Sequence, residues 1–410
     1  MNSTRPVPPV WLMGLSSATL GVTNGIIFFV APQLMASAHV PEPKIAAITA
    51  IASTPYFWFV FLAPILDVRF SRRWYATTLA LVSGTTAATA VLSLHHLLVL
   101  QIALVISGAA AILSSSALGG WLSNITPNEH KNLLSKWINI ALFSGTGLIA
   151  GAGGELVRRL PLILAAFLMG TIVFIPAAIF LFIPAPGPDR RLASESFLQF
   201  NREVLSLLRR REVLIVLLLF LSPCSTFALT NLLGGLGADF HASARAVSLS
   251  GGVGAFIPGV LGCSLFPAIA RRLRLRSFYF ANGIAGCVFT LSLVILPHTT
   301  STFALALFGE FLFQAVSYAI QIGIMFEAIG PDNPLAATTF AFLAAATNIP
   351  MTYLTFVDGR AYAAAGIRGM LFTDAGIGIL ACTVAAVLFA KFGSRTAARE
   401  NSVVLPLEES

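Results

Sequence analysis

Charged residues are scarce in this sequence of 410 residues, of which Asp, Glu, Lys and Arg make up only 10%. Soluble domains carry about 25% charged residues, whereas here 57% of the residues are hydrophobic and the mean hydropathy is +0.85. No polar stretch is long enough to form a separate soluble catalytic domain. The composition therefore excludes a soluble globular enzyme and predicts an integral membrane protein.

Residues that bind metals or form disulfides are few and scattered. The cysteines stand singly in apolar segments, without a CxxC pair, at Cys224, Cys263, Cys287 and Cys382. This pattern indicates neither a disulfide framework nor a zinc site. The six histidines all fall at the ends of apolar runs or between them. We therefore expect no metal and no cofactor.

Twelve apolar runs are long enough to cross a bilayer as helices, which takes about 20 residues each. They lie at about 10–36, 44–66, 74–94, 97–123, 136–157, 161–184, 213–236, 244–270, 277–297, 302–327, 334–358 and 368–392. Runs of this length are too long for barrel strands. The first run is also long enough to remain in the bilayer, so we interpret it as a span and not as a signal peptide.

The longest polar segment separates the sixth apolar run from the seventh. The sequence thus predicts an all-α integral membrane protein with twelve transmembrane helices in two six-helix bundles. We place the N-terminal bundle at 1–184, a cytoplasmic linker at 185–212, the C-terminal bundle at 213–392 and a cytoplasmic tail at 393–410.

Basic residues lie mainly on one side of the predicted spans. If the N-terminus is cytoplasmic, 19 of the 25 Lys and Arg residues fall on the inside, six of them in the central linker. The positive-inside rule then predicts a multi-pass protein of the cytoplasmic (inner) membrane with both termini in the cytoplasm. This topology explains the basic pI near 9.7, so we expect no binding to nucleic acid.

The two halves of the chain repeat each other with an offset of 203 residues. Pro55 and Pro64 of the second span correspond to Pro258 and Pro267 of the eighth, and Arg69 corresponds to Arg272. Parallel repeats of six spans are typical of transporters of the major facilitator superfamily.

The segment 63–73 resembles the loop between spans two and three of that superfamily, in which an acidic residue precedes a basic cluster. Ala63 and Phe70 replace the usual glycines. Wider stretches resemble the AmpG-like permeases and their acetyl-CoA transporter relatives, at Gly21, Gly25, Phe28, Pro32, Pro55, Tyr56, Phe61, Pro64, Asp67, residues 336–343, Asn348, Gly366, Leu371 and Phe372. The resemblance implies a proton-driven importer of muropeptides, or of siderophores as in a similar group.

Polar residues inside spans are costly and usually line a pathway. Span ten carries a stripe at helical spacing, Glu310, Gln314, Ser317 and Gln321, with Tyr318 beside it. We assign proton coupling to Glu310, with Asp374 as the next candidate. The predicted substrate-binding residues belong to spans one, four, seven and ten, the cavity-lining spans of the superfamily: Asn24, Gln101, Thr226, Asn231, Gln314, Tyr318 and Gln321.

Each assignment has a structural alternative. Small hydroxyl residues in spans one, four and seven also let helices pack closely. Glu310 could be a permanently protonated group that bonds to a neighbouring helix, and Asp374 could lie at the membrane interface. Glu155, Arg158 and Arg159 have the spacing of a surface ion pair.

A gate is predicted at the cytoplasmic end of span two. Asp67 is followed by Arg69, Arg72 and Arg73, so a carboxylate and several cations share one helix end. They could pair with each other or with neighbouring helices and favour one access state. The alternative is a plain topogenic loop.

No Lys or Arg falls in the middle of a span. A cavity without a fixed cation counts against acetyl-CoA, organophosphates and citrate-like solutes. It also fits poorly with the carboxylates of muropeptide stems, although sugar hydroxyls and amides suit Asn, Gln and Ser.

Together these features predict a monomeric secondary transporter that moves a muropeptide-like or similar polar solute with protons, by alternating access. A permease that imports or exports a siderophore or a drug-like solute is the alternative within transport. Outside transport, the alternatives are a non-transporting sensor and a membrane-embedded enzyme; for the enzyme, no catalytic grouping of His, Cys and acid is evident.

Overall fold

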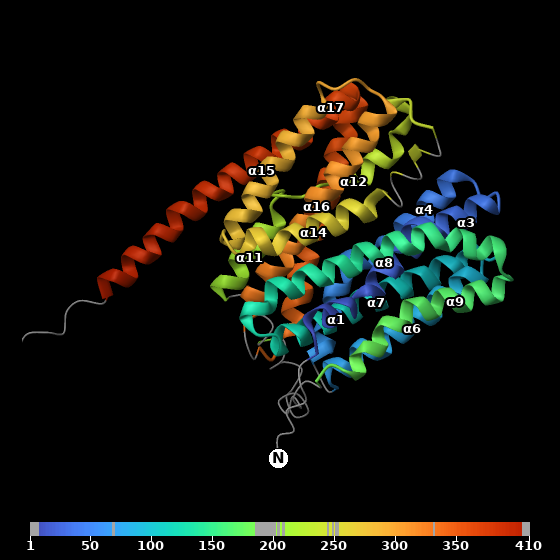
Figure 1. Cartoon of the computed structure of the whole chain (residues 1–410), viewed down its shortest axis with the longest axis horizontal. Helices are drawn as coiled ribbons and strands as arrows, with labels where there is room; N and C mark the ends of the chain where they lie inside the picture. The colour runs from blue at the N-terminus through green and yellow to red at the C-terminus, as the bar shows by residue number, and fades with distance from the viewer. Residues whose placement is uncertain are drawn as a thin grey trace, which may run out of the picture.

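The computed structural model describes residues 8–67, 70–184, 202, 206, 210–243, 246–247, 250, 254–330 and 333–403. Within these residues all regular secondary structure is helical, as the sequence predicts. Figure 1 shows the helices of the first half, blue to green, in one bundle and those of the second half, yellow to red, in another. The helices α8 and α14 run side by side where the two bundles meet.

The first half supplies six spans. The first contains α1 (Val10–Leu15), α2 (Ala18–Gly25), η1 (Ile26–Val30) and α3 (Ala31–Ser37). The second contains α4 (Glu42–Ser53), α5 (Pro55–Trp58), η2 (Phe59–Phe61) and η3 (Ala63–Asp67). The remaining four are α6 (Arg72–Leu92), α7 (Leu97–Ile125), α8 (Lys131–Arg159), which η4 (Asn128–His130) precedes, and α9 (Leu162–Phe174), which continues as η5 (Ile175–Leu181).

In the second half, two spans are joined into one helical element. This half contains α11 (Arg211–Leu221), α12 (Leu229–Leu232), η6 (Leu233–Gly235), η7 (Gly237–Phe240), α14 (Gly254–Ala270), α15 (Leu275–Leu293), α16 (Thr300–Ile329) and α17 (Ala336–Val403). Within α17 the backbone leaves helical geometry at Ala365 and Gly366, where Gly366 has φ of +62°. A positive φ is accessible to glycine at little cost, so the eleventh span turns into the twelfth here.

Seven of these helical segments are long and apolar enough to cross a membrane, and two shorter apolar helices accompany them among the described residues. The shorter ones belong to spans two and eight. Most of the linker 185–212 and the side chains of the tail 393–410 lie outside the described residues. The boundaries of the bundles therefore stay predictions.

Span seven is broken in the middle of the bundle. Helix α11 ends at Leu221, the backbone is extended at Ser222, and Ser225 has φ of +52° before α12 begins at Leu229. Pro223 lies in this gap, and a proline inside a helix removes a backbone hydrogen bond. The carbonyl groups of this unwound segment accept hydrogen bonds from side chains of α16, namely Gln314 and Ser317.

The predicted repeat appears in the positions of the helices. Helix α6 begins at Arg72 and α15 at Leu275, and α7 begins at Leu97 and α16 at Thr300. Both pairs are separated by the predicted offset of 203 residues. Residues at this offset can therefore be compared between the bundles.

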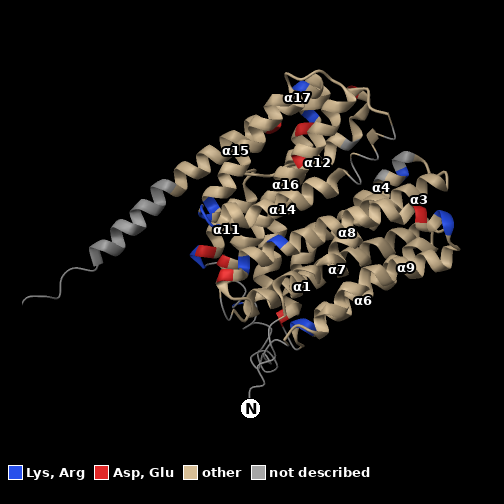
Figure 2. Ribbon diagram, viewed as in Figure 1, with Lys and Arg blue, Asp and Glu red and all other residues tan. Residues whose placement is uncertain are grey.

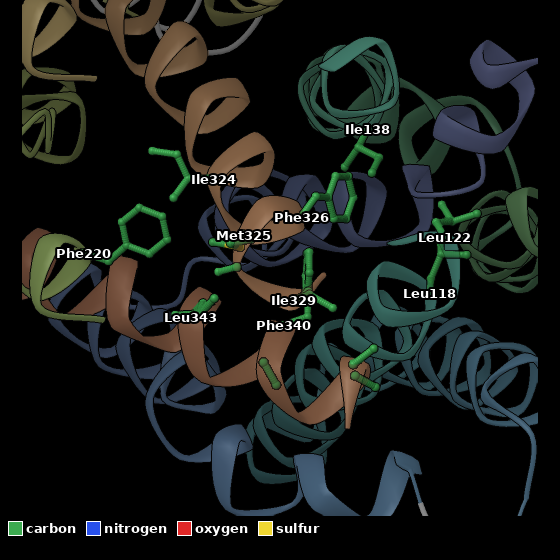
Figure 3. Packing of buried hydrophobic residues seen from close by; sticks show 14 of the residues in the cluster. Leu118, Leu122, Ile138, Phe220, Ile324, Met325, Phe326, Ile329, Phe340 and Leu343 are labelled. Carbon is green, nitrogen blue, oxygen red and sulfur yellow. The ribbon is translucent and has the colours of Figure 1, made fainter. Parts of the chain in front are cut away.

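Buried hydrophobic residues join the bundles at one end. Leu118 and Leu122 of α7 belong to the same core cluster as Ile329 of α16 and Phe340 of α17, and Figure 3 shows these side chains around the helices of both bundles. Charged residues lie mostly toward the ends of the helices, as Figure 2 shows. The predicted ion pair of Glu155 with Arg158 and Arg159 is confirmed.

Candidate transport cavity and gate

A cavity of about 1070 Å³ lies between the two bundles. Its walls come from spans one, two, four and five of the first half and from spans seven, ten and eleven of the second. Neither bundle forms the cavity alone, so a movement of one against the other would change its shape and access.

Uncharged side chains make up the whole described lining of this cavity. Its polar members are hydroxyl and amide residues, namely Ser17, Asn24, Thr49, Ser53, Tyr56, Ser115, Ser116, Asn139, Asn231, Tyr318, Gln321, Thr347, Asn348, Thr352 and Thr355. Aromatic rings of Phe28, Phe57, Phe59 and Phe340 add apolar surface. Such walls can form hydrogen bonds and stack on rings, but they offer no counter-charge to an ion.

Four of the seven predicted substrate-binding residues line the cavity: Asn24, Asn231, Tyr318 and Gln321. The other three do not. Gln101 lies near the start of α7, Thr226 lies in the unwound segment of span seven, and Gln314 turns toward that segment instead. The sequence located the polar helices correctly but could not tell the cavity face from the bundle interior.

Spans two, five and eleven supply lining residues that the sequence analysis did not assign to the site. Tyr56 and Asn348 of α17 were noted only as part of the family resemblance, and Asn139 of α8 was not considered. The one available signal for Asn139 was an amide in the middle of an apolar span, which usually indicates a pathway.

Hydrogen bonds hold several lining residues in place. The Tyr56 hydroxyl donates to Asn24 Oδ1, and Gln321 Nε2 donates to the Tyr279 hydroxyl at 3.2 Å. The Tyr318 ring stacks on Phe143 of the other bundle, with centroids 6.0 Å apart. These groups are oriented before any solute arrives, which reduces the entropy cost of binding.

Asn139 differs from these residues because half of its amide has no partner. Its Nδ2 donates to the carbonyl of Ser135 at 3.0 Å, whereas its Oδ1 is buried without a hydrogen bond. A buried acceptor without a donor is unfavourable by about 1–3 kcal/mol. A solute hydroxyl or amide that donates to this oxygen would relieve that cost.

The gate predicted at span two crosses from one bundle to the other. Asp67 is buried, and its Oδ1 accepts from Arg72 Nε at 2.7 Å. Its Oδ2 accepts from the backbone N–H and the hydroxyl of Thr338, both at 2.7 Å, and its Oδ1 from the N–H of Ala337 at 3.3 Å. These N–H groups belong to the first turn of α17, where a helix has unpaired donors and a partial positive charge.

The gate continues through Arg72 to the loop before α17. Arg72 Nη2 donates to the carbonyls of Pro334 at 2.6 Å and Asn333 at 3.3 Å. Arg73 is partly exposed on α6, and Arg69 lies outside the described residues. The structure shows contacts between the bundles for Asp67 and Arg72 only, and a gating role stays a prediction for all four residues.

A second set of contacts closes the same end between α8 and α16. Lys131 Nζ donates to the Phe326 carbonyl at 3.4 Å, and the Ser135 hydroxyl donates to the Ala319 carbonyl. Phe326 lies in the last turn of α16, where a cation is favourable. The first bundle thus places an anion at the start of α17 and a cation at the end of α16.

Helices α7 and α17 also touch closely at this end. A Cβ added to Gly120 of α7 would lie 2.4 Å from the backbone nitrogen of Ala337. Only glycine permits this approach. The cavity is therefore shut at the predicted cytoplasmic end, while at its other end the lining residues Phe28, Asn231 and Thr352 are exposed.

The two predicted proton-coupling residues lie beside the cavity and not in its lining. Glu310 is fully buried in α16, and its Oε1 accepts from the Thr290 hydroxyl at 2.7 Å. Asp374 is buried in the second half of α17. A third carboxyl group, Asp358, is fully buried in the first half of α17 and was missed by the sequence analysis. The described residues contain no group of His, Cys, Asp and Glu suited to a metal ion.

Comparisons with known proteins also indicate a transporter. The sequence profile described as Major Facilitator Superfamily matches residues 13–339, more than half of the chain. None of the curated proteins matches the sequence.

Several solved transporter structures are similar to the chain. The fucose:proton symporter of E. coli has a TM-score of 0.72 at 16% identity, over 94% of this chain and 98% of that one. The human organic anion transporter MFSD10 has a TM-score of 0.68 at 15% identity, over 92% and 98%. A bacterial homologue of the iron transporter ferroportin, in an outward-facing state, has 0.66 at 15% identity, over 94% and 100%. At these identities the likeness shows the fold alone, and it confirms the predicted arrangement of twelve helices in two bundles.

Proposed function

Because the chain belongs to the Major Facilitator Superfamily, we propose that it is a solute:proton symporter that carries a muropeptide-like or similar polar solute across the cytoplasmic membrane. It is a multi-pass membrane transporter by family and not an enzyme. The solute, the coupling ion and the direction of transport are our proposals.

The observation that supports this proposal most is the cavity between the bundles, with its uncharged lining. Its volume of about 1070 Å³ lies just above the range of about 300–1,000 Å³ for small-molecule pockets. A solute larger than a single sugar would fill it. Ions with several charges would lose their hydration there without gaining a counter-charge.

The lining suits a glycan with amide groups. The unpaired Oδ1 of Asn139 accepts from a hydroxyl, and the amides of Asn231 and Asn348 can donate and accept. Aromatic rings such as Tyr318 present flat apolar surface for a sugar ring. The resemblance to AmpG-like permeases points to the sugar-peptide of a muropeptide within this class, bound chiefly through its sugar part.

The cycle starts from the state described here, which we interpret as outward-facing. Asp67 and Arg72 hold the cytoplasmic ends of the bundles together, while the predicted outer end of the cavity is open. Solute contacts from both bundles draw the outer ends together and strain the inner contacts. Release of Asp67 from the first turn of α17 then opens the cavity to the cytoplasm.

Protons enter this scheme through Glu310, with Asp374 nearby. A buried carboxylate without a cation partner is unfavourable, so uptake of a proton favours the closed packing around α16. Its loss favours a rearranged packing. The downhill movement of protons can in this way drive the solute uphill.

Uptake into proteoliposomes with an imposed pH gradient tests the proposal. Neutral amino-sugar disaccharides, a muropeptide and citrate should be compared in wild type and in Asn139→Asp, which adds a carboxylate to the lining, with Asp239→Asn as a control outside the cavity. We expect accumulation of the disaccharide or muropeptide, little of citrate, and impaired uptake in Asn139→Asp only. Preference for citrate would contradict the proposed solute class, and absence of any uptake would favour a sensor.

The alternative, export of a siderophore or a drug-like solute, is favoured by the aromatic share of the lining. It makes an opposite prediction about direction. With protons more concentrated inside the vesicles than outside, an exporter of antiporter type takes up solute, whereas a symporter does not.

A further inference from the structure

Three buried carboxyl groups lie together in the outer half of the C-terminal bundle. Glu310 is about ten residues, or about 15 Å at 1.5 Å per residue, from the start of α16. Asp358 and Asp374 lie at similar distances from the turn at Gly366 that joins the last two spans. Glu310 and Asp358 are fully buried, Asp374 is 9% exposed, and none of the three lines the cavity.

Asp358 and Asp374 each lie eight residues from the turn at Gly366, so the two halves of α17 bring them to the same depth of the bundle, where their carboxyl groups lie within hydrogen-bonding reach of each other. Glu310 is close enough to interact electrostatically with both. Yet both oxygens of Asp358 and Oε2 of Glu310 are buried without a donor. Two ionised carboxylates contain no hydrogen to share, so this contact is a hydrogen bond only if one of the aspartates carries a proton.

No basic side chain compensates these acids among the described residues. The ion pairs of the described chain involve other carboxylates. Arg360, two residues after Asp358, is exposed and lies over the Phe356 ring, and Arg368 is exposed. From α15 the titratable group facing the cluster is the Cys287 thiol, and Asp239 of η7 accepts instead from the Tyr362 hydroxyl.

We propose that Asp358 is the third member of a proton-binding site with Glu310 and Asp374, and that Asp358 and Asp374 share a proton in the state described here. The proton is bonded to an oxygen of one aspartate and hydrogen bonded to an oxygen of the other. On release it bonds to water as hydronium and leaves a carboxylate behind. This inference rests on the proposed function and names its proton site.

A single hydrogen bond connects the helix that carries Glu310 with the segment that reaches the cavity. Gln314 lies one turn from Glu310 on α16, and its Nε2 donates to the Thr230 hydroxyl of α12 at 2.8 Å. The next residue, Asn231, lines the cavity. A solute that moves α12 through Asn231 therefore acts on the helix face that carries Glu310, without touching the carboxyl groups.

The first experiment compares Asp358→Asn with wild type in proteoliposomes. Asparagine keeps the size but cannot exchange a proton, so we expect gradient-driven accumulation to be lost and solute exchange without a gradient to persist. Asp358→Glu, which keeps a carboxyl group, should restore part of the accumulation. Asp239→Asn, an acid of the same bundle outside the cluster, is the matched control and should accumulate normally. Normal accumulation in Asp358→Asn would overturn the proposal.

A second experiment does not depend on transport. Infrared difference spectra of the solute-free protein between acidic and alkaline pH report protonated carboxylic acids directly. We expect the signal of buried carboxylic acids to decrease in Asp358→Asn and in Glu310→Gln, but not in Asp239→Asn. An unchanged signal in Asp358→Asn overturns the shared proton even if no solute is found. A signal that sodium ions abolish at constant pH would instead indicate a sodium site and would also overturn it.

Discussion

The two bundles repeat each other in position and differ in where they carry buried acids. At the offset of 203 residues, Glu310 of α16 corresponds to Ser107 of α7. Ser107 donates to the carbonyl of Ser83 at 2.9 Å, and the Ser83 hydroxyl also pairs with that of Thr23 at 3.1 Å. This network in the N-terminal bundle is neutral and satisfied, whereas its counterpart in the C-terminal bundle holds carboxyl groups with unpaired oxygens.

The opposite asymmetry occurs at the gate. Asp67 at the end of span two corresponds to Ala270 at the end of span eight, and Arg72 corresponds to Leu275. The N-terminal bundle thus supplies the charges proposed to hold the predicted cytoplasmic end closed, and the C-terminal bundle supplies the acids proposed to bind protons. The comparison teaches that one repeated scaffold can separate gating from coupling, because each needs buried charge in only one copy.

The largest effect is expected from Asp67→Ala, which removes the buried carboxylate of the N-terminal bundle. Breaking a buried ion pair is unfavourable by about 3–5 kcal/mol, and here it also removes the cap of α17. The cytoplasmic end should open, and a cysteine placed at the buried Ser123 of α7 should react much faster with a thiol reagent. Arg271→Ala, which removes an exposed arginine directly after α14, serves as the control. An unchanged labelling rate in Asp67→Ala would show that the segment 63–73 is a plain topogenic loop and not a gate.

A smaller shift of the same equilibrium is expected from Gly120→Val. The added side chain overlaps the start of α17, and such overpacking is unfavourable by about 1–3 kcal/mol. Spin labels on the cytoplasmic ends of α7 and α17 should move apart. Gly376→Ala is the matched control, because a Cβ there meets nothing within 4 Å. Equal distances in both variants would show that close packing does not hold the gate.

Tyr56→Phe tests solute binding in the cavity, which residues of both bundles line. It removes the hydroxyl that orients Asn24 and keeps the ring, so binding should weaken by about 0.5–1.5 kcal/mol. The solute concentration for half-maximal exchange should rise accordingly, with the proton dependence unchanged. Tyr353→Phe, whose hydroxyl bonds to the Leu221 carbonyl outside the cavity, should bind normally. A loss confined to Tyr353→Phe would place the solute elsewhere.

The smallest effect is expected at the ion pair of Glu155 with Arg158 and Arg159. It is exposed, and such pairs contribute about 0–1 kcal/mol. Glu155→Gln should leave transport and melting temperature close to those of wild type. A large loss of transport would show that charge at the outer end of α8 takes part in the cycle.

The sequence predicted the fold because bilayer spans require long apolar runs, and it predicted the stripe on α16 because polar residues repeat there with helical spacing. The same spacing could not separate Gln321, which reaches the cavity, from Gln314, which faces the unwound segment of span seven. Asp358 was missed because it is the last residue of the predicted run 334–358, where a charged residue is expected at the membrane interface. The contacts of Asp67 with the other bundle could not be predicted, since most of them are made by backbone N–H groups of α17.

The central claim, that the acids of the C-terminal bundle couple solute to protons, is tested most directly by measuring proton and solute fluxes together in the same vesicles. Wild type and Ser107→Ala, the variant at the corresponding position of the other bundle, should both take up protons with the solute. Glu310→Gln should exchange solute without moving protons. Proton uptake that persists in Glu310→Gln but disappears in Ser107→Ala would contradict the account and move coupling to the N-terminal bundle.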